Sequence, residues 1–147
     1  MRLTSYRIGT SESFGAVAGE GLIDLGPRLR TYPTLRALIA AGALAEAQAA
    51  VQGAAPDHKM ADVVLLPPVP APEKIWCIGV NYAERNEEYK DNSERPKYPS
   101  LFCRAPASLV GHEQAIERPR VSTQLDYEGE IAIVIGRGGR HIPRERA

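Results

Sequence analysis

Two glutamates near the C-terminal end of the 147-residue sequence have the spacing of a metal-binding pair. Glu128 and Glu130 directly precede residues 131–135, an apolar and mostly β-branched run that predicts a buried strand. In a strand, alternate side chains point to one side, so both carboxylates would share a face, about 6.6 Å apart along the chain. Such charges repel each other unless a cation neutralises them, and Mg²⁺, Mn²⁺ or Ca²⁺ suits oxygen ligands. The alternative is that both lie at the solvated end of an edge strand and bind nothing.

The composition narrows the classes of partner. Eighteen basic and eighteen acidic residues cancel, without a long stretch of one sign, which argues against a nucleic-acid surface and favours a small-molecule partner. No apolar run is long enough to cross a membrane, and the N-terminus lacks the apolar core of a signal peptide, so we expect a cytoplasmic protein. The two cysteines, Cys77 and Cys103, fall in predicted strands, where buried, reduced thiols are expected.

The first part of the chain predicts a small domain of sheet and helix, residues 1–66. Strands are expected at residues 3–8, 14–18, 21–25 and 61–66, with a helix at 35–51 that Thr34 caps and Gly42 interrupts. Asp24, Glu46 and His58 are single polar groups, which predicts surface positions and a packing or lid-like role for this domain.

A proline-rich connector, residues 67–73, precedes a second domain at 74–147. The pattern there predicts strands at 74–80, 101–104 and 108–111, a short helix at 83–89, a loop up to Lys97, and a turn at 112–114. The strand that carries the two glutamates completes it.

Three segments of the second domain resemble the fumarylacetoacetate hydrolase family. They are Lys74-Ile75-Trp76-Cys77-Ile78-Gly79-Val80-Asn81-Tyr82, the stretch from Ser100 to Gly111, and Asp126-Tyr127-Glu128-Gly129-Glu130. The resemblance implies an α+β, β-rich fold, in which the small N-terminal domain is followed by a mixed β-roll. It also implies that Mg²⁺ or Mn²⁺ is held by Glu128, Glu130 and an aspartate a few dozen residues further on.

The sequence stops soon after the predicted metal pair, at Ala147. We therefore expect an incomplete roll, with the third metal ligand missing and the metal weakly bound or absent. Because an open roll exposes unpaired strand edges, we also expect a homodimer or a larger homo-oligomer.

The resemblance also implies where substrate binds and protons move. Relatives commonly carry a histidine three residues after the tyrosine that corresponds to Tyr82, paired with a glutamate three further on; these positions are Arg85 and Glu88 here. Arginine stays charged and cannot act as a base, so Glu88 is expected to move protons while Arg85 binds a substrate carboxylate. Alternatively, both are solvated helix charges. Tyr82, Arg104 and Ser108 are the other expected substrate contacts.

The function implied is that of a metal-dependent enzyme acting on 2-oxo or 1,3-dicarbonyl acids through an enolate whose charge the metal takes up. Carbon–carbon bond hydrolysis comes first, as the namesake reaction of the family. Decarboxylation and isomerisation share the same intermediate and are the alternatives. A binding or structural module without catalytic activity is the alternative from another class.

Overall fold

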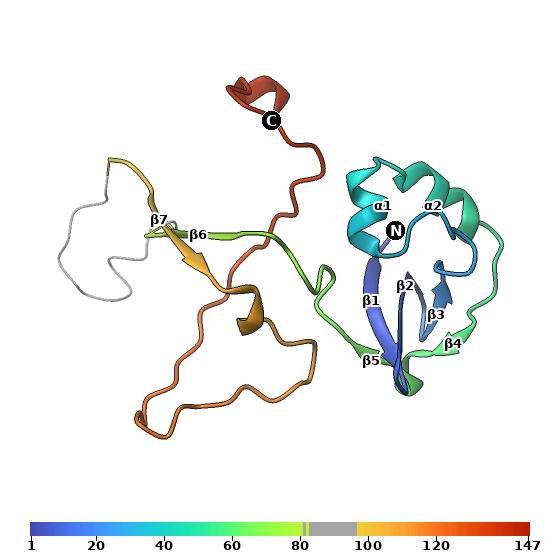
Figure 1. The fold of residues 1–147 in the computed structure, drawn as a ribbon, viewed down its shortest axis with the longest axis horizontal. Coiled ribbons are helices and arrows are strands. Elements are labelled where there is room, and N and C mark those ends of the chain that lie inside the picture. Colours follow the sequence, from blue (N-terminus) through green and yellow to red (C-terminus); the bar gives the residue numbers. More distant parts are fainter. Residues whose placement is uncertain (81, 83–96) are drawn as a thin grey trace. The chain divides into compact units, whose positions relative to one another are not determined.

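In the computed structural model of the chain, residues 1–80, 82 and 97–147 are described (Figure 1). They form two units, Met1–Val69 with Val110–Ala147, and Pro70–Leu109. In chain order the elements are β1 Leu3–Ile8, β2 Ser11–Ala18, β3 Gly21–Asp24, α1 Leu35–Ala40, α2 Leu44–Val51, β4 His58–Lys59, the 3₁₀ turn Met60–Asp62, β5 Val64–Leu65, β6 Ile75–Gly79, β7 Ser100–Arg104, and the 3₁₀ turns Pro106–Ser108 and Arg144–Arg146. The predicted α+β, β-rich class is confirmed. None of the described helices is long and apolar enough to cross a membrane.

The first unit is built on an antiparallel sheet with the strand order β4-β3-β2-β1-β5. Short turns join the first three strands, and Gly9 and Gly19 adopt positive φ angles of 57° and 59° in those turns. Glycine takes this backbone conformation without a steric penalty, so consecutive strands can pair directly. The first three strands are confirmed, with β2 beginning earlier, at Ser11, than predicted.

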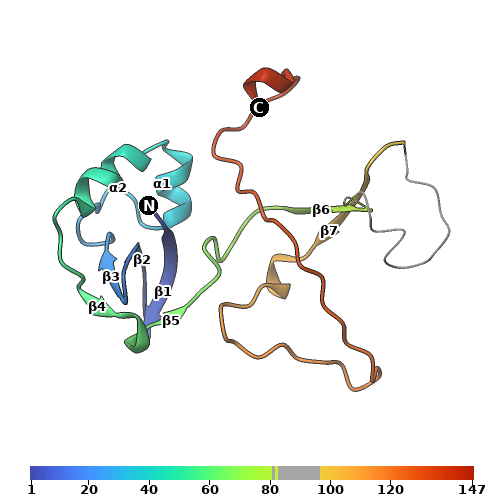
Figure 2. The ribbon, with the colours of Figure 1, turned by 180° about the vertical axis from the view of Figure 1, so that it is seen from behind.

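Both α-helices pack on one face of this sheet, as the view from behind also shows (Figure 2). The buried core joins Phe14 and Ala16 of β2 to Leu35 and Leu38 of α1. The Thr34 hydroxyl accepts a hydrogen bond from the Ala37 backbone N–H at 3.1 Å, so the predicted N-cap is confirmed.

The predicted interruption of the helix is confirmed, and one predicted strand of this unit is shortened. The predicted helix is divided into α1 and α2 at Gly42, which has a φ of 69°. The predicted strand at 61–66 is reduced to β5, because the 3₁₀ turn Met60–Asp62 precedes it.

The second unit contains the hairpin of β6 and β7, both of which were predicted. Trp76 lies opposite Cys103, and Ile78 lies opposite Leu101. Directly opposed residues of antiparallel strands point to the same face, so these four side chains form one apolar face. The predicted burial of Cys103 is wrong, since this face is exposed: 61% of Trp76 and 60% of Leu101 are accessible.

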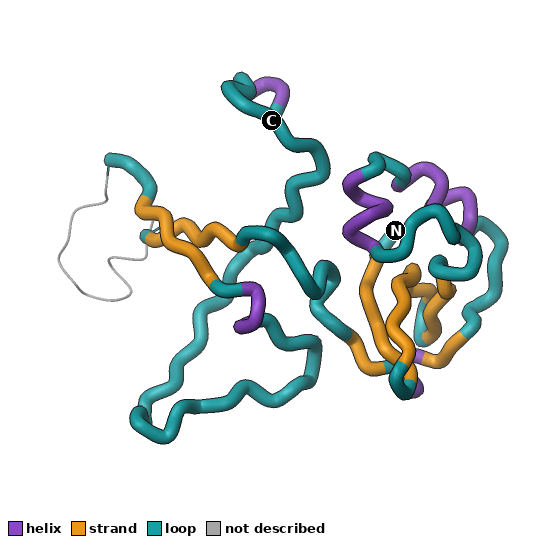
Figure 3. Tube along the Cα trace, viewed as in Figure 1, coloured by secondary structure: helices purple, strands orange, loops and turns teal. Residues whose placement is uncertain are grey.

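The chain after β7 lacks the strands that the sequence predicted (Figure 3). In place of a strand at 108–111 it forms the 3₁₀ turn Pro106–Ser108, which proline at its start favours. Residues 131–135 are not a strand either, and Ile131 and Ile133 are each 81% exposed. A strand needs a hydrogen-bonded neighbour, and none of the described strands pairs with this segment.

Gly15 tests the packing of β2 against β3. A Cβ at this position would collide with the Ile23 carbonyl and the Leu22 side chain, whereas a Cβ at Gly129 would meet nothing within 4 Å. We predict that Gly15→Ala lowers the free energy of unfolding by about 1–3 kcal/mol. Gly129→Ala should stay within about 0.5 kcal/mol of the parent. Urea denaturation followed by circular dichroism measures both, and equal stability of the two variants would contradict this packing.

Candidate functional site

The predicted metal pair lies in a stretch of the first unit without regular secondary structure. Glu128 and Glu130 are both exposed, and neither belongs to a strand. The strand predicted to carry them is therefore not formed, because no described strand pairs with residues 131–135. That both carboxylates can meet one cation stays a prediction. The two residues remain adjacent to the apolar run, as the sequence requires.

The chemistry of this pair fits a divalent cation. Two carboxylates two residues apart offer the oxygen donors that Mg²⁺ and Mn²⁺ prefer, and each can contribute at least one bond to a six-coordinate shell. Within the described part of the chain, no group of three His, Cys, Asp or Glu side chains could hold a metal ion. Two carboxylates alone would leave most positions of a six-coordinate shell to other donors.

The predicted substrate contacts Tyr82, Arg104 and Ser108 belong to the other unit, and all three are exposed. The Arg104 guanidinium lies over the Phe102 ring, 5.8 Å from its centroid, on the same face of β7. The Ser108 hydroxyl donates to the Ala105 carbonyl at 2.8 Å, which stabilises the 3₁₀ turn. Arg104 can still bind an anion, whereas the Ser108 hydroxyl already has a structural partner.

The predicted proton-transfer and anion-binding residues, Glu88 and Arg85, lie outside the described residues. The same is true of the helix predicted at residues 83–89. Their assignment stays a prediction from the sequence.

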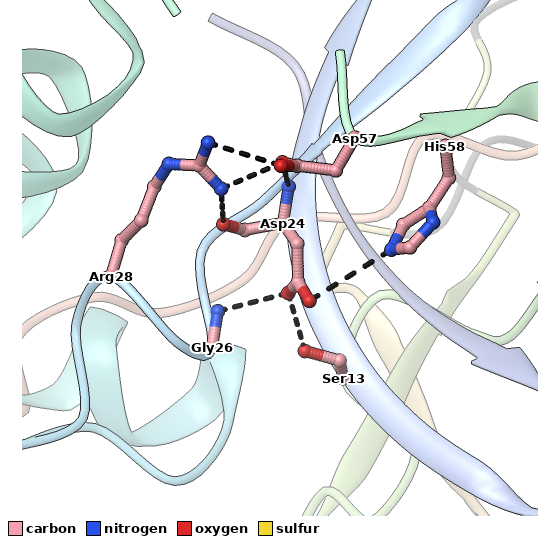
Figure 4. Close-up of polar contacts among 6 residues, drawn as sticks. All are labelled: Ser13, Asp24, Gly26, Arg28, Asp57 and His58. Carbon is pink, nitrogen blue, oxygen red and sulfur yellow. Dashed lines mark hydrogen bonds and ion pairs between the residues drawn. The ribbon is translucent and has the colours of Figure 1, made fainter.

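A polar cluster in the first unit was not predicted (Figure 4). The carboxylate of Asp24 accepts hydrogen bonds from the Ser13 hydroxyl at 2.7 Å and the Gly26 N–H at 3.1 Å. Its other oxygen lies 3.9 Å from Nε2 of His58. Asp24 and His58 are therefore not the isolated polar groups that the sequence indicated.

Asp57 connects this cluster by hydrogen bonds to the turn that follows β3. Its carboxylate accepts two hydrogen bonds from the Arg28 guanidinium, at 2.6 and 3.1 Å, and one from the Asp24 N–H at 2.8 Å. The hydrogen bond from Arg28 is the main reason that the pKa of Asp57 lies below its usual range. Arg28 also donates to the Asp24 carbonyl at 2.7 Å, so one side chain joins both aspartates.

Tyr6 forms the buried side of the same cluster. It is 1% exposed, and its ring contacts the His58 ring with 5.8 Å between the centroids. Burial raises the pKa of Tyr6 to about 12, so its hydroxyl stays protonated at neutral pH. We interpret the cluster as structural, because its hydrogen bonds join β2, the end of β3 and the start of β4 to one another.

The second half of the chain, residues 74–147, matches the family model described as the C-terminal domain of fumarylacetoacetate hydrolase. This match confirms the resemblance found in the sequence. It includes both glutamates of the metal pair.

Several relatives are similar over much of the chain. Oxaloacetate tautomerase YisK of Bacillus subtilis is 38% identical over 92 residues, which are 61% of this chain and 31% of YisK. The human mitochondrial oxaloacetate tautomerase FAHD2A is 32% identical over 97% of this chain and 47% of its own length. The rat mitochondrial oxaloacetate tautomerase Fahd2a is 35% identical over 84% of this chain and 40% of its own length. The chain thus spans less than half the length of each of these relatives.

A solved structure is similar in fold. It is that of a putative HpcE protein from Mycobacterium smegmatis, with a TM-score of 0.59 and 20% sequence identity. The match covers 79% of this chain and 40% of the other.

Asp57→Asn tests the cluster around Arg28 and Asp24. Because the folded-state pKa of Asp57 is depressed, its ionised form stabilises the fold above the unfolded-state pKa, and this contribution is lost as the pH falls through the folded-state pKa. We predict a loss of about 1 kcal/mol at pH 7, since the pair is partly exposed. This loss should shrink as the pH falls below about 3.9, the ordinary pKa of an aspartate in an unfolded chain. Thermal unfolding from pH 2 to 8 measures this. Asp62→Asn, at an exposed site, is the control, and a loss that is independent of pH would contradict the role of charge.

Proposed function

Because the chain belongs to the fumarylacetoacetate hydrolase family, we propose that it is a divalent-metal-dependent enzyme that interconverts the keto and enol forms of a 2-oxo dicarboxylic acid such as oxaloacetate. The observation that carries the proposal is the pair Glu128 and Glu130 within the region that matches the family model. The names of three relatives, all oxaloacetate tautomerases, support this reaction over others.

Glu128 and Glu130 would hold Mg²⁺ or Mn²⁺. When bound, the ion supplies positive charge that stabilises the negative charge developing on the 2-oxo group. The two carboxylates would then be relieved of their mutual repulsion, because the cation lies between like charges. The exposure of both residues leaves room for water to complete a six-coordinate shell.

The proposed reaction moves one proton and needs no attacking water. A C–H bond next to the 2-oxo group breaks, an O–H bond forms at the 2-oxo oxygen, and the double bond shifts from C=O to C=C. This fits a sequence with Arg85 where relatives commonly have histidine, since a histidine–glutamate pair for activating water is missing. Glu88 is the proposed proton-transfer group, and Arg85 the proposed partner of a substrate carboxylate.

Carbon–carbon bond hydrolysis is the second candidate. The description of the matching family model favours it. It requires an activated water, which Glu88 would have to supply without a neighbouring histidine. An assay with both oxaloacetate and a 1,3-dicarbonyl acid separates the two reactions, because only hydrolysis splits the substrate into two products.

The metal pair provides the principal test. With Mg²⁺ or Mn²⁺ added, we predict that the chain converts the enol form of oxaloacetate to the keto form. The decrease in the ultraviolet absorbance of the enol measures the rate. Glu128→Gln and Glu130→Gln should each lower the rate by about tenfold or more, because an amide is a weaker, uncharged ligand. Both should also weaken Mn²⁺ binding measured by electron paramagnetic resonance.

Glu117→Gln is the matched control, since Glu117 is an exposed glutamate of the same unit. It should change neither the rate nor the Mn²⁺ affinity. A chain that neither binds Mn²⁺ nor converts oxaloacetate would contradict the proposal and favour the non-catalytic module.

Arg85 and Glu88 are predicted to respond differently to substitution. Arg85→Lys keeps the charge and loses the two-pronged hydrogen bonding, so it should raise KM more than it lowers kcat. Glu88→Gln keeps the size and loses the base, so it should mainly lower kcat. Steady-state kinetics on oxaloacetate measure both. Full turnover by Glu88→Gln would show that another group transfers the proton.

A further inference from the structure

The chain leaves and rejoins the first unit at the same edge of its sheet. β5 is the last strand in the order β4-β3-β2-β1-β5, so one of its edges has no neighbouring strand among the described residues. The outgoing chain is bound to β1 at this point, because the Leu66 N–H donates to the Ser5 carbonyl at 3.0 Å. The Ser5 hydroxyl also donates to the Pro68 carbonyl at 2.7 Å. The unit Pro70–Leu109 follows directly.

The returning chain is bound to β5 by the side chain of Gln114. Its Nε2 donates to the Leu65 carbonyl at 3.3 Å, and its Oε1 accepts from the Gly111 N–H at 3.2 Å. Both hydrogen bonds are partly buried. A carboxamide carries the same donor and acceptor as a peptide group. The Gln114 side chain therefore contacts β5 in the manner of one residue of an added strand.

Gly111 allows the returning chain to come close to β5. It is buried, and a Cβ at this position would collide with the Leu65 carbonyl. The Gln114 N–H donates to the Gly111 carbonyl at 3.2 Å, which closes a tight turn between the two residues. The turn thus holds the carboxamide next to β5.

We propose that Gly111 and Gln114 form a latch that fastens the returning chain to the edge of β5. The folded sheet domain is then discontinuous in sequence, comprising residues 1–69 and the latch segment 110–114. The latch covers a carbonyl group that an edge strand would otherwise present to other chains. This inference is independent of the proposed enzymatic activity.

Hydrogen exchange on the 147-residue chain tests the latch. Gln114→Ala should accelerate exchange in peptides that cover residues 110–114 by about three- to tenfold, the effect of losing one or two hydrogen bonds. Peptides from β2 and β3 should keep their protection, because their hydrogen bonds do not involve Gln114. Gln124→Ala, at an exposed glutamine, should leave both regions unchanged.

Gln114→Glu separates hydrogen bonding from packing. Glutamate keeps the size and the acceptor but cannot donate to the Leu65 carbonyl when ionised, so exchange at 110–114 should be faster at pH 7. Below about pH 4 the protonated acid can donate, and the difference from the parent measured at the same pH should narrow. Unchanged exchange in both Gln114 variants would overturn the latch. Loss of protection in β2 and β3 as well would also overturn it, because Gln114 would then stabilise the whole sheet.

Discussion

Hydrogen bonding between strand edges is the constraint on which this structure depends. β1 is paired along both of its edges: six of its residues pair with β2, and two pair with β5. The helices pack against Phe14 and Ala16, which lie two residues apart on β2 and therefore share one face of the sheet. Where strands find partners, as in the sheet from β4 to β5, the chain builds a buried core. Residues 131–135 pair with none of the described strands, and they form no strand.

Features that depend on neighbouring residues could be predicted from the sequence more readily than those that depend on distant partners. The first three strands, the Thr34 cap and the break at Gly42 depend on residues only a few positions apart, and all were predicted. The absence of strands at 108–111 and 131–135 was not predicted, because an apolar pattern indicates a preference for extended backbone and gives no information about the partner strand. The exposure of Cys103 has the same origin, since burial of a hairpin face depends on what covers it.

The polar residues also differ in whether they could be recognised from the sequence. The pair Glu128 and Glu130 was recognised because its two members are neighbours in sequence and the flanking segments resemble a family. The cluster around Asp57 was missed because Arg28 and Asp57 are separated by 29 positions, and no local pattern joins them. The role of Gln114 could not be recognised either, since its partner Leu65 is 49 positions away. Contacts of this kind become visible only when the topology places two segments side by side.

Strand pairing also bears on the proposed metal site. Two carboxylates at alternate positions share a face only in an extended strand, whereas an unpaired segment samples many backbone conformations and loses entropy when a cation orders it. A neighbouring strand along residues 131–135 would cover side chains such as Ile131 and Ile133. Its hydrogen bonds and this burial would offset the entropy lost when the segment becomes ordered. Cation binding would offset the electrostatic repulsion between the carboxylates of Glu128 and Glu130. The two events must therefore stabilise each other, because each is more favourable once the other has taken place.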